Sequence, residues 1–336
     1  MSKRETKVKN QHYVSCFYLR AFARERTSPY HIIYIFDKIM NKTFPNNVTN
    51  SAVERYFYDI PEKWLSEPGA DVQTVEKALG VYERYYQICH QRALGLKAGE
   101  SLDLETASIL GHMMLTQYAR TVTMRKAAHE NQMKILQEMV DDLMQRNFTP
   151  EECASANPRI QMDERTTGLL LCEMMLDGPS MDLKVKFLLG KFWTIWLNRT
   201  PNLFITSDNP VSMAVTSKGA VENGVAPLSP FGVEVAFPLS SRCVLTIGDV
   251  PLIRRRNREV LYADDQRIQE FNAMQVISSK RYLFGAMNDF QQATRMCEAD
   301  PTLRSEARDQ SMVATYREET KTTTISSWTP RHLKRY

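Results

Sequence analysis

The stretch N-L-F-I-T-S-D-N-P-V-S-M-A-V, residues 202 to 215, marks a change in the character of the chain. Its short apolar runs, separated by Ser-Asp-Asn-Pro, predict two strands and a turn. Before it, between Val72 and Asn198, apolar residues recur at steps of three and four, which is typical of helices. After it, residues 234–239 and 242–247 are again short β-rich runs. Helices in one block and strands in another predict an α+β fold and not a doubly wound sheet.

The helical middle is expected to contain one very long helix. Asp103 is a suitable N-cap, and no proline interrupts the chain from there to about Asn147. Gly111 and residues 121–123 are the points at which so long a helix would bend or break. Further helices are predicted at residues 72–93, 164–176, 182–198 and 264–278.

The strands are expected to form a mixed or antiparallel sheet in a β-rich C-terminal half. An additional hairpin is predicted near the N-terminus, with strands at residues 31–37 and from 43 onward, and a last strand at 281–284. We predict a basic flexible leader at residues 1–10, and a single two-lobed domain at 11–300. A polar extension, basic at its end, follows at 301–336.

The composition excludes several classes of protein. The chain has 336 residues, of which 43% are hydrophobic and 24% charged, so collagen-like, disulfide-scaffold and wholly disordered proteins are excluded. The formal net charge is +4, yet residues 10–320 contain 35 basic and 38 acidic side chains. The basic excess therefore lies at the two ends, which disfavours a broad basic groove for nucleic acid.

The cysteines and apolar runs bear on the compartment. Six cysteines are widely spaced without a Cys-x-x-Cys pair, and no apolar run is long enough for a signal peptide or a membrane span. We therefore expect a cytoplasmic protein with free thiols and no membrane partner. No glycine-rich phosphate loop, nucleotide-cofactor motif or zinc motif is present in the sequence.

Eight blocks in a fixed order carry a resemblance to a known family: residues 11–22, 54–58, 75–83, 117–121, 204–211, 237–240, 271–275 and 281–284. They resemble the domain-of-unknown-function 4238 family, and F-I-T-S-D-N-P-V at 204–211 is the most specific match. The sequence departs from the family pattern at Ser15-Cys16, where a dipeptide containing proline is expected. The resemblance implies the boundary of the domain and a map of site residues, and it implies no activity.

Seven polar residues inside these blocks are expected to converge on one cleft between the helical middle and the β-rich half: His12, Glu54, Glu83, Gln117, Arg120, Asp208 and Asn272. Asp208 follows an apolar strand and would present its carboxylate at a sheet edge. The alternative is a structural turn, in which Asp208 and Asn209 bond their own backbone before Pro210.

Four of these residues have both a structural and a functional interpretation: His12, Glu83, Gln117 and Arg120. Glu83 and Arg120 form either an ion pair between two helices or, with Gln117, a clamp for an anionic substrate. His12 is either a general acid or base near neutral pH or a residue that pins the first segment through a ring hydrogen bond.

Two functions from different classes are predicted. The first is a hydrolase of phosphate-containing substrates, a nuclease among them, for which a bacterial effector or defence role is a further hypothesis. Such a hydrolase would act on a nucleic acid or a nucleotide. If it uses a cofactor, we expect a divalent metal bound by Asp208 and Glu83. Its catalytic residues would be His12, Glu54, Glu83 and Asp208, and its substrate-binding residues Gln117, Arg120, Asn209 and Asn272. The second function is a non-enzymatic module that binds a ligand or a protein.

Overall fold

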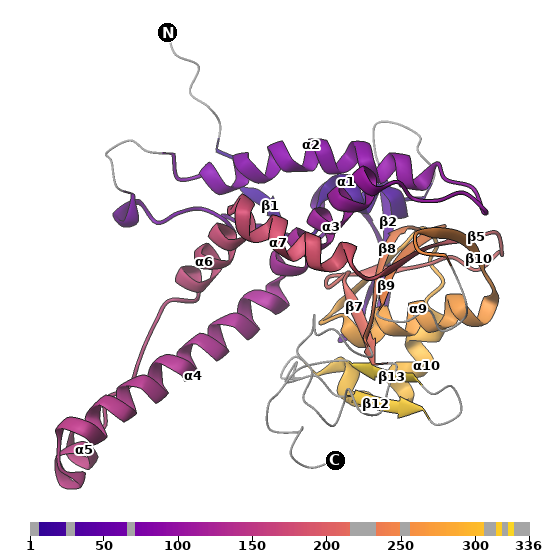
Figure 1. Cartoon of the computed structure of the whole chain (residues 1–336). Helices are drawn as coiled ribbons and strands as arrows, with labels where there is room; N and C mark the ends of the chain where they lie inside the picture. Colours follow the sequence, from indigo (N-terminus) through magenta and orange to yellow (C-terminus); the bar gives the residue numbers. More distant parts are fainter. Residues whose placement is uncertain are drawn as a thin grey trace.

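Three sheets and a group of packed helices build the computed structural model of the chain (Figure 1). It describes residues 7–24, 31–65, 71–215, 233–248, 256–305, 314–317 and 322–325. The two larger sheets occupy one side of the molecule, α2 (Thr74–Leu94) runs along its top, and α4 (Val122–Asn147) projects away as an arm. The chain is thus α+β, as predicted.

The largest sheet is mixed, in agreement with the sequence. Its strand order is β10-β5-β9-β8-β7-β13-β12, and only the β10–β5 pair is parallel. The strands are β5 (Phe192–Asn198), β7 (Ser212–Val215), β8 (Val233–Ser240), β9 (Cys243–Gly248), β10 (Glu259–Ala263), β12 (Ala314–Arg317) and β13 (Thr322–Ile325).

A second sheet joins the two ends of the domain. The predicted hairpin is present as β2 (Ile32–Asp37) and β3 (Lys42–Asn47). β2 also pairs with β11 (Tyr282–Gly285), which pairs in turn with β6 (Thr206–Ser207), so the order is β3-β2-β11-β6. The third sheet is the small antiparallel pair of β1 (Asn10–His12) and β4 (Val53–Arg55), which sets Gln11 opposite Glu54.

The helices pack mainly on one another and on the largest sheet. α3 contacts α2, α6 and α7, and α9 contacts both β6 and β7. The remaining helices are α1 (Cys16–Leu19), α3 (Leu104–Ala119), α5 (Pro150–Ala156), α6 (Glu164–Leu176), α7 (Gly178–Leu189), α9 (Asp265–Ser278) and α10 (Gln291–Ala299). Short 3₁₀ turns are η1 (Arg20–Phe22), η2 (Val48–Asn50), η3 (Glu62–Trp64) and η4 (Pro301–Arg304).

The prediction of one very long helix is wrong. Residues 103–147 form two helices, α3 and α4, which are separated at Arg120 and Thr121. Thr121 has an extended backbone, and its hydroxyl accepts a hydrogen bond from the Met124 amide at 3.2 Å, so it is the N-cap of a new helix. The break falls in the weak segment 121–123. The other suspected weak point, Gly111, lies inside α3, where a methyl group would meet the Trp193 ring at 3.4 Å.

The prediction of a helix over residues 182–198 is wrong in its second half. α7 ends at Leu189, the C-cap is Gly190, and F-W-T-I-W-L-N becomes β5. Aromatic and β-branched residues favour a strand when both faces are covered, and Trp193 and Ile195 are fully buried there.

The predicted C-terminal extension takes part in the fold. It supplies η4 as well as β12 and β13, which complete one edge of the largest sheet. The end of the extension, residues 326–336, and residues 1–6 of the predicted leader lie outside the described residues. Within the described segments no helix is both long enough and apolar enough to cross a membrane.

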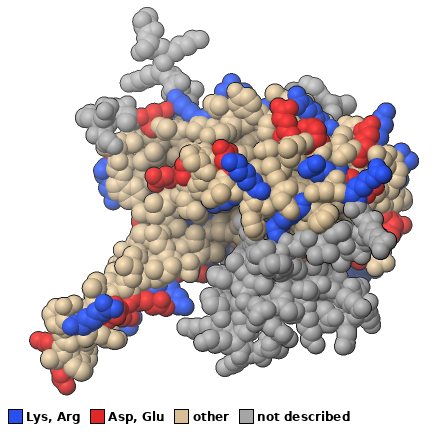
Figure 2. Space-filling model, viewed as in Figure 1, with Lys and Arg blue, Asp and Glu red and all other residues tan. Residues whose placement is uncertain are grey.

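Charged side chains of both signs are interspersed over the visible face of the body (Figure 2). Few charged side chains are visible on the inner half of the arm and on the part of the body that adjoins it. This face therefore presents no broad surface of one sign, as expected from the nearly balanced charge of residues 10–320.

Candidate functional site

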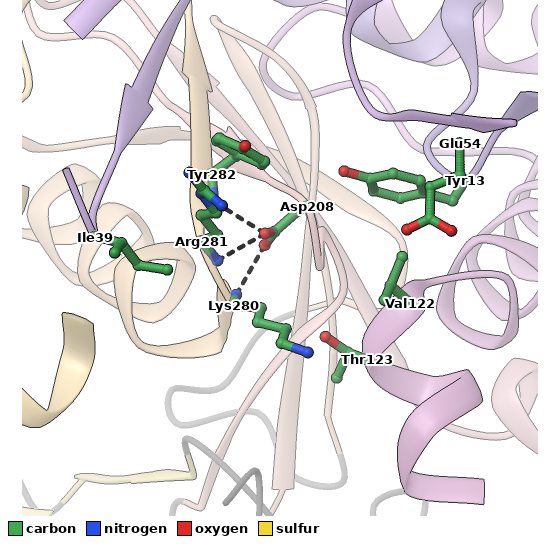
Figure 3. Close-up of a pocket in the computed structure, with 9 residues that line it drawn as sticks. All are labelled: Tyr13, Ile39, Glu54, Val122, Thr123, Asp208, Lys280, Arg281 and Tyr282. Carbon is green, nitrogen blue, oxygen red and sulfur yellow. Dashed lines mark hydrogen bonds between the residues drawn. The ribbon is translucent and has the colours of Figure 1, made fainter. Parts of the chain in front are cut away.

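The predicted site residues separate into two main groups. We call the first the Arg120 cluster; its members are His12, Ser15, Tyr58, Glu83, Gln117 and Arg120. We call the second the Asp208 pocket, a cavity of about 300 Å³ lined by Tyr13, Ile39, Glu54, Val122, Thr123, Asp208, Lys280, Arg281 and Tyr282 (Figure 3). Asn209 and Asn272 belong to neither.

The Arg120 guanidinium makes all of its hydrogen bonds inside the protein. Its Nε donates to the Tyr58 hydroxyl at 3.0 Å, and its Nη1 donates to Glu83 Oε1 at 2.6 Å and to Ser15 Oγ at 2.7 Å. Its Nη2 donates to the His12 carbonyl. The side chain is 3% exposed, so the ion pair between α2 and α3 is present and closed to solvent at the arginine. An anionic substrate would have to displace these partners.

Local structure explains why Arg120 lies there. It is the C-cap of α3, one turn after Gln117, so both side chains leave the helix on the same side. The Gln117 Nε2 donates to the Tyr13 carbonyl at 2.9 Å, and its Oε1 accepts from the Ser15 amide at 3.3 Å. Ser15, at the position where the sequence departs from the family pattern, also donates its hydroxyl to Glu83 at 2.7 Å. Together these bonds fix residues 12–15 against α2 and α3.

The His12 ring is half-buried at the edge of this cluster. It makes a hydrogen bond to the Val48 backbone, and its Nε2 is buried with no hydrogen-bond partner in the described part of the chain. Burial lowers the pKa of His12, and the neighbouring Arg120 lowers it further. The imidazole is therefore neutral at physiological pH.

A second glutamate of α2 lies close to the cluster. Glu76 feels the charges of Arg120 and Glu83, and its Oε2 is buried without a hydrogen-bond partner among the described residues. Burial raises the pKa of Glu76 to about 7. It is therefore partly protonated near neutral pH.

Asp208 lines the Asp208 pocket, and its carboxylate points toward the backbone of residues 280–282 (Figure 3). Its Oδ1 accepts from the Lys280 amide at 2.8 Å, and its Oδ2 accepts from the Arg281 and Tyr282 amides at 2.7 and 2.9 Å. Burial raises the pKa of Asp208, while these backbone hydrogen bonds oppose the rise. The carboxylate fixes the segment that links α9 to β11.

The structural alternative supposed that the Asp208 side chain bonds its own turn, and the structure shows that it does not. Nor does the Asn209 side chain bond its own turn, since its Nδ2 donates to the Ser278 carbonyl at 3.1 Å; the turn bond is the Asn209 amide donating to Ser207 Oγ at 3.2 Å. Asn272, on α9, donates to the Leu203 carbonyl at 2.9 Å and accepts from the Ile205 amide at 3.0 Å. Both asparagines hold backbone in place and do not line the pocket.

Two residues of opposite charge face the cavity from different elements. Glu54 comes from β4 and, with Tyr13, lies across the cavity from Asp208, while the Lys280 side chain extends toward Thr123 (Figure 3). Partial burial raises the pKa of Glu54, and the positive charges of Arg125 and Lys280 oppose this rise. The pocket thus offers a carboxylate that binds protons more readily than usual and an ammonium group.

The other cations near the pocket have structural partners. Arg281 forms an ion pair with Asp37, with its Nη2 at 2.8 Å and its Nε at 3.0 Å from Oδ2. Lys38 is fully buried and donates to the Val276 and Ser279 carbonyls at 2.9 and 2.6 Å, at the C-terminal end of α9. Lys280 is therefore the cation best placed for a ligand.

The predicted metal ligands do not share a site. Glu83 is bonded to Arg120 and Ser15, whereas both oxygens of Asp208 accept backbone amides. In the segments that the structure describes, no group of three or more His, Cys, Asp or Glu residues is arranged to hold a metal ion. The described residues around Asp208 and Glu83 therefore do not fit the metal hypothesis.

Five polar lining residues were not among the sequence candidates: Tyr13, Thr123, Lys280, Arg281 and Tyr282. Tyr13, Arg281 and Tyr282 lie inside the family-like blocks, and Lys280 directly precedes the last of them. Thr123 belongs to the weak segment between α3 and α4. The blocks therefore contain three of the five, and the helix break is what brings Thr123 to the pocket.

The family model described as "Protein of unknown function (DUF4238)" matches residues 10–289, and the chain belongs to this family. The match covers the described residues of both the Arg120 cluster and the Asp208 pocket. No curated protein matches the chain. No solved structure matches it either.

Proposed function

We propose that the Asp208 pocket binds a small molecule that carries one phosphate group. The observation behind this proposal is that Lys280 and Glu54, of opposite charge, face one cavity of about 300 Å³. Pockets for small molecules begin at about this volume, so a metabolite of the size of a sugar phosphate or a nucleoside monophosphate suits it better than a polymer.

Each end of such a ligand has a partner in the pocket. The phosphate would bind the Lys280 ammonium and the Thr123 hydroxyl, because a charged donor gives the stronger hydrogen bonds to phosphate. A ligand hydroxyl would donate to the Glu54 carboxylate on the opposite side. Asp208 would act indirectly by holding the backbone on which Lys280 is presented.

A hydrolase of phosphate-containing substrates, a nuclease among them, is the second candidate. The observation that favours it is the raised pKa of Glu54 beside a cation. A carboxyl group of this kind can transfer a proton to or from a reacting oxygen, and Lys280 would stabilise charge on the phosphoryl group. In this proposal Glu54 is the acid or base, and the Arg120 cluster positions the first segment without touching the substrate. A nucleotide or nucleic-acid substrate and an effector role belong to this candidate.

Titration calorimetry with ribose 5-phosphate tests the binding proposal. We expect binding to the wild type, no binding of ribose, and an affinity at least about tenfold lower for Lys280→Met, because one charge-assisted bond is lost. The matched control is Lys134→Met on α4, where the lysine side chain is 57% exposed and outside the pocket. Equal affinities of the two variants would contradict the proposal, as would absence of binding to the wild type.

Turnover assays test the second candidate. p-Nitrophenyl phosphate and single-stranded RNA are incubated with the wild type, Glu54→Gln, and the control Glu130→Gln, whose carboxylate is 58% exposed on α4. Turnover that is lost only in Glu54→Gln supports the hydrolase. Turnover that Glu54→Gln retains, or none in the wild type, contradicts it and leaves the binding function.

A further inference from the structure

A second cavity lies at another edge of the molecule. It has a volume of about 470 Å³ and is bounded by η1, the loop after α2, the ends of β5 and β10, and the turn between β8 and β9. It shares no lining residue with the Asp208 pocket. We call it the Arg242 pocket.

The charges that line the Arg242 pocket have one sign. Among the residues that the structure describes, its lining contains no Asp or Glu. It contains four cationic residues: Arg20, Lys97, Arg199 and Arg242. All four are exposed, and none forms an ion pair with a carboxylate in the described part of the chain. Because residues 10–320 as a whole carry more acidic than basic side chains, this concentration is local.

Two of the arginines are held in position by the protein. The Arg242 Nη1 donates to the Thr200 carbonyl, and the Arg242 amide donates to the hydroxyl of the buried Ser240 at 3.1 Å. The Arg199 guanidinium lies 3.9 Å from the centroid of the Tyr262 ring. Positioned guanidinium groups lose less freedom on binding an anion than unsupported ones do.

The remaining lining is apolar or aromatic. Leu94, Leu96 and Leu197 contribute aliphatic surface, and the Tyr262 side chain is 41% exposed. The pocket therefore combines a strongly cationic part with a surface on which a planar ring can pack.

We propose that the Arg242 pocket binds a nucleoside diphosphate. Four cations match a ligand with about three negative charges better than a single carboxylate or phosphate. The base would pack on the leucines. A nucleic acid is the less favoured ligand, because the visible surface of the body carries interspersed charges of both signs and no continuous basic track (Figure 2). This site is additional to the proposed function of the Asp208 pocket.

Calorimetry with ADP, adenosine and pyrophosphate tests this proposal. We expect ADP to bind, pyrophosphate to bind more weakly, adenosine not to bind, and the affinity for ADP to fall as salt increases. The double variant Arg20→Gln/Arg242→Gln should bind ADP at least about tenfold more weakly. The control Arg84→Gln/Arg92→Gln changes the same charge on the exposed side of α2 and should stay within about twofold of the wild type.

The outcomes separate this site from the Asp208 pocket. ADP binding that Lys280→Met leaves unchanged and Arg20→Gln/Arg242→Gln weakens supports the Arg242 pocket, whether or not ribose 5-phosphate binds elsewhere. The proposal is overturned if the double variant binds ADP like the wild type while unfolding at the same urea concentration. It is also overturned if single-stranded RNA binds through these arginines and ADP does not.

Discussion

The Arg120 cluster and the Asp208 pocket contain the same kinds of residue and use them differently. In the cluster, Arg120 and Glu83 satisfy each other and the backbone of the first segment, and the arginine is buried. In the pocket, Glu54 and Lys280 lie on different walls of a cavity. A charged side chain within an apolar segment is therefore either a polar contact of the core or a group available for binding. It belongs to the core when the fold places a partner of opposite charge beside it, as Glu83 is placed beside Arg120.

The largest effect is expected from Arg120→Met. It removes the guanidinium that donates to Tyr58, Ser15 and the His12 carbonyl, and it leaves the Glu83 carboxylate with the Ser15 hydroxyl but without its cation, so the free energy of unfolding should fall by about 3 kcal/mol or more. Urea unfolding measures this loss. Arg92→Met is the control, because its ion pair with Glu105 is long and exposed, and it should change the free energy by less than about 0.5 kcal/mol. Equal losses in both variants would show that the cluster does not stabilise the fold.

Asp208→Ala should have the next largest effect. It removes the acceptor of three backbone amides, and a lower free energy of unfolding by about 2–4 kcal/mol is expected, since each unpaired buried group costs about 1–3 kcal/mol and the pocket admits some water. The control is Asp182→Ala, whose carboxylate is 65% exposed. If the two variants unfold at the same urea concentration, Asp208 does not hold the start of β11.

Glu76 gives the Arg120 cluster a dependence on pH. Its pKa in the folded protein, about 7, is above the ordinary value of 4.5, so the folded state binds the proton more tightly. This contribution to stability is complete below pH 4.5 and is lost as the pH rises to about 7. Glu76→Gln should therefore gain stability relative to the wild type over that interval, by about 1–3 kcal/mol. Urea unfolding at pH 4.5, 5.5 and 7 measures the difference; a difference that is constant with pH would contradict the shift.

Lys280→Met should have the smallest effect on stability. Its ammonium faces the pocket, so the free energy of unfolding should change by less than about 0.5 kcal/mol, as for most surface substitutions. The same urea experiment measures it, with Lys134→Met alongside. A loss as large as that of Asp208→Ala would show that Lys280 supports the fold, and the contrast between the two regions would disappear.

Local sequence signals predicted the local parts of this fold. The hairpin of β2 and β3, the helix at residues 164–176 and the N-cap Asp103 follow from turn chemistry, periodicity and capping, and all are confirmed. These signals depend on neighbours within a few residues. The mixed sheet follows from the same short strands.

Long-range packing accounts for what the sequence did not predict. β5 has an apolar pattern that suits a helix or a buried strand, and its burial between neighbours selects the strand. The three amides that Asp208 binds lie more than 70 residues away, so nothing near Asp208 indicates them. Likewise, the pairing of β1 with β4 brings Glu54 to the pocket, and no local signal separated it from Glu83.

The most direct test of whether Glu54 and Lys280 face one binding pocket is a measurement of the Glu54 pKa. Carboxyl carbon NMR follows this pKa in the wild type and in Lys280→Met. We expect Glu54 to titrate above its ordinary pKa of 4.5, and higher still without the Lys280 ammonium. We also expect ribose 5-phosphate to move the Glu54 resonance and not that of Glu83. A Glu54 pKa at the ordinary value, unchanged by Lys280→Met and by the ligand, would contradict the assignment of this pocket as the functional site.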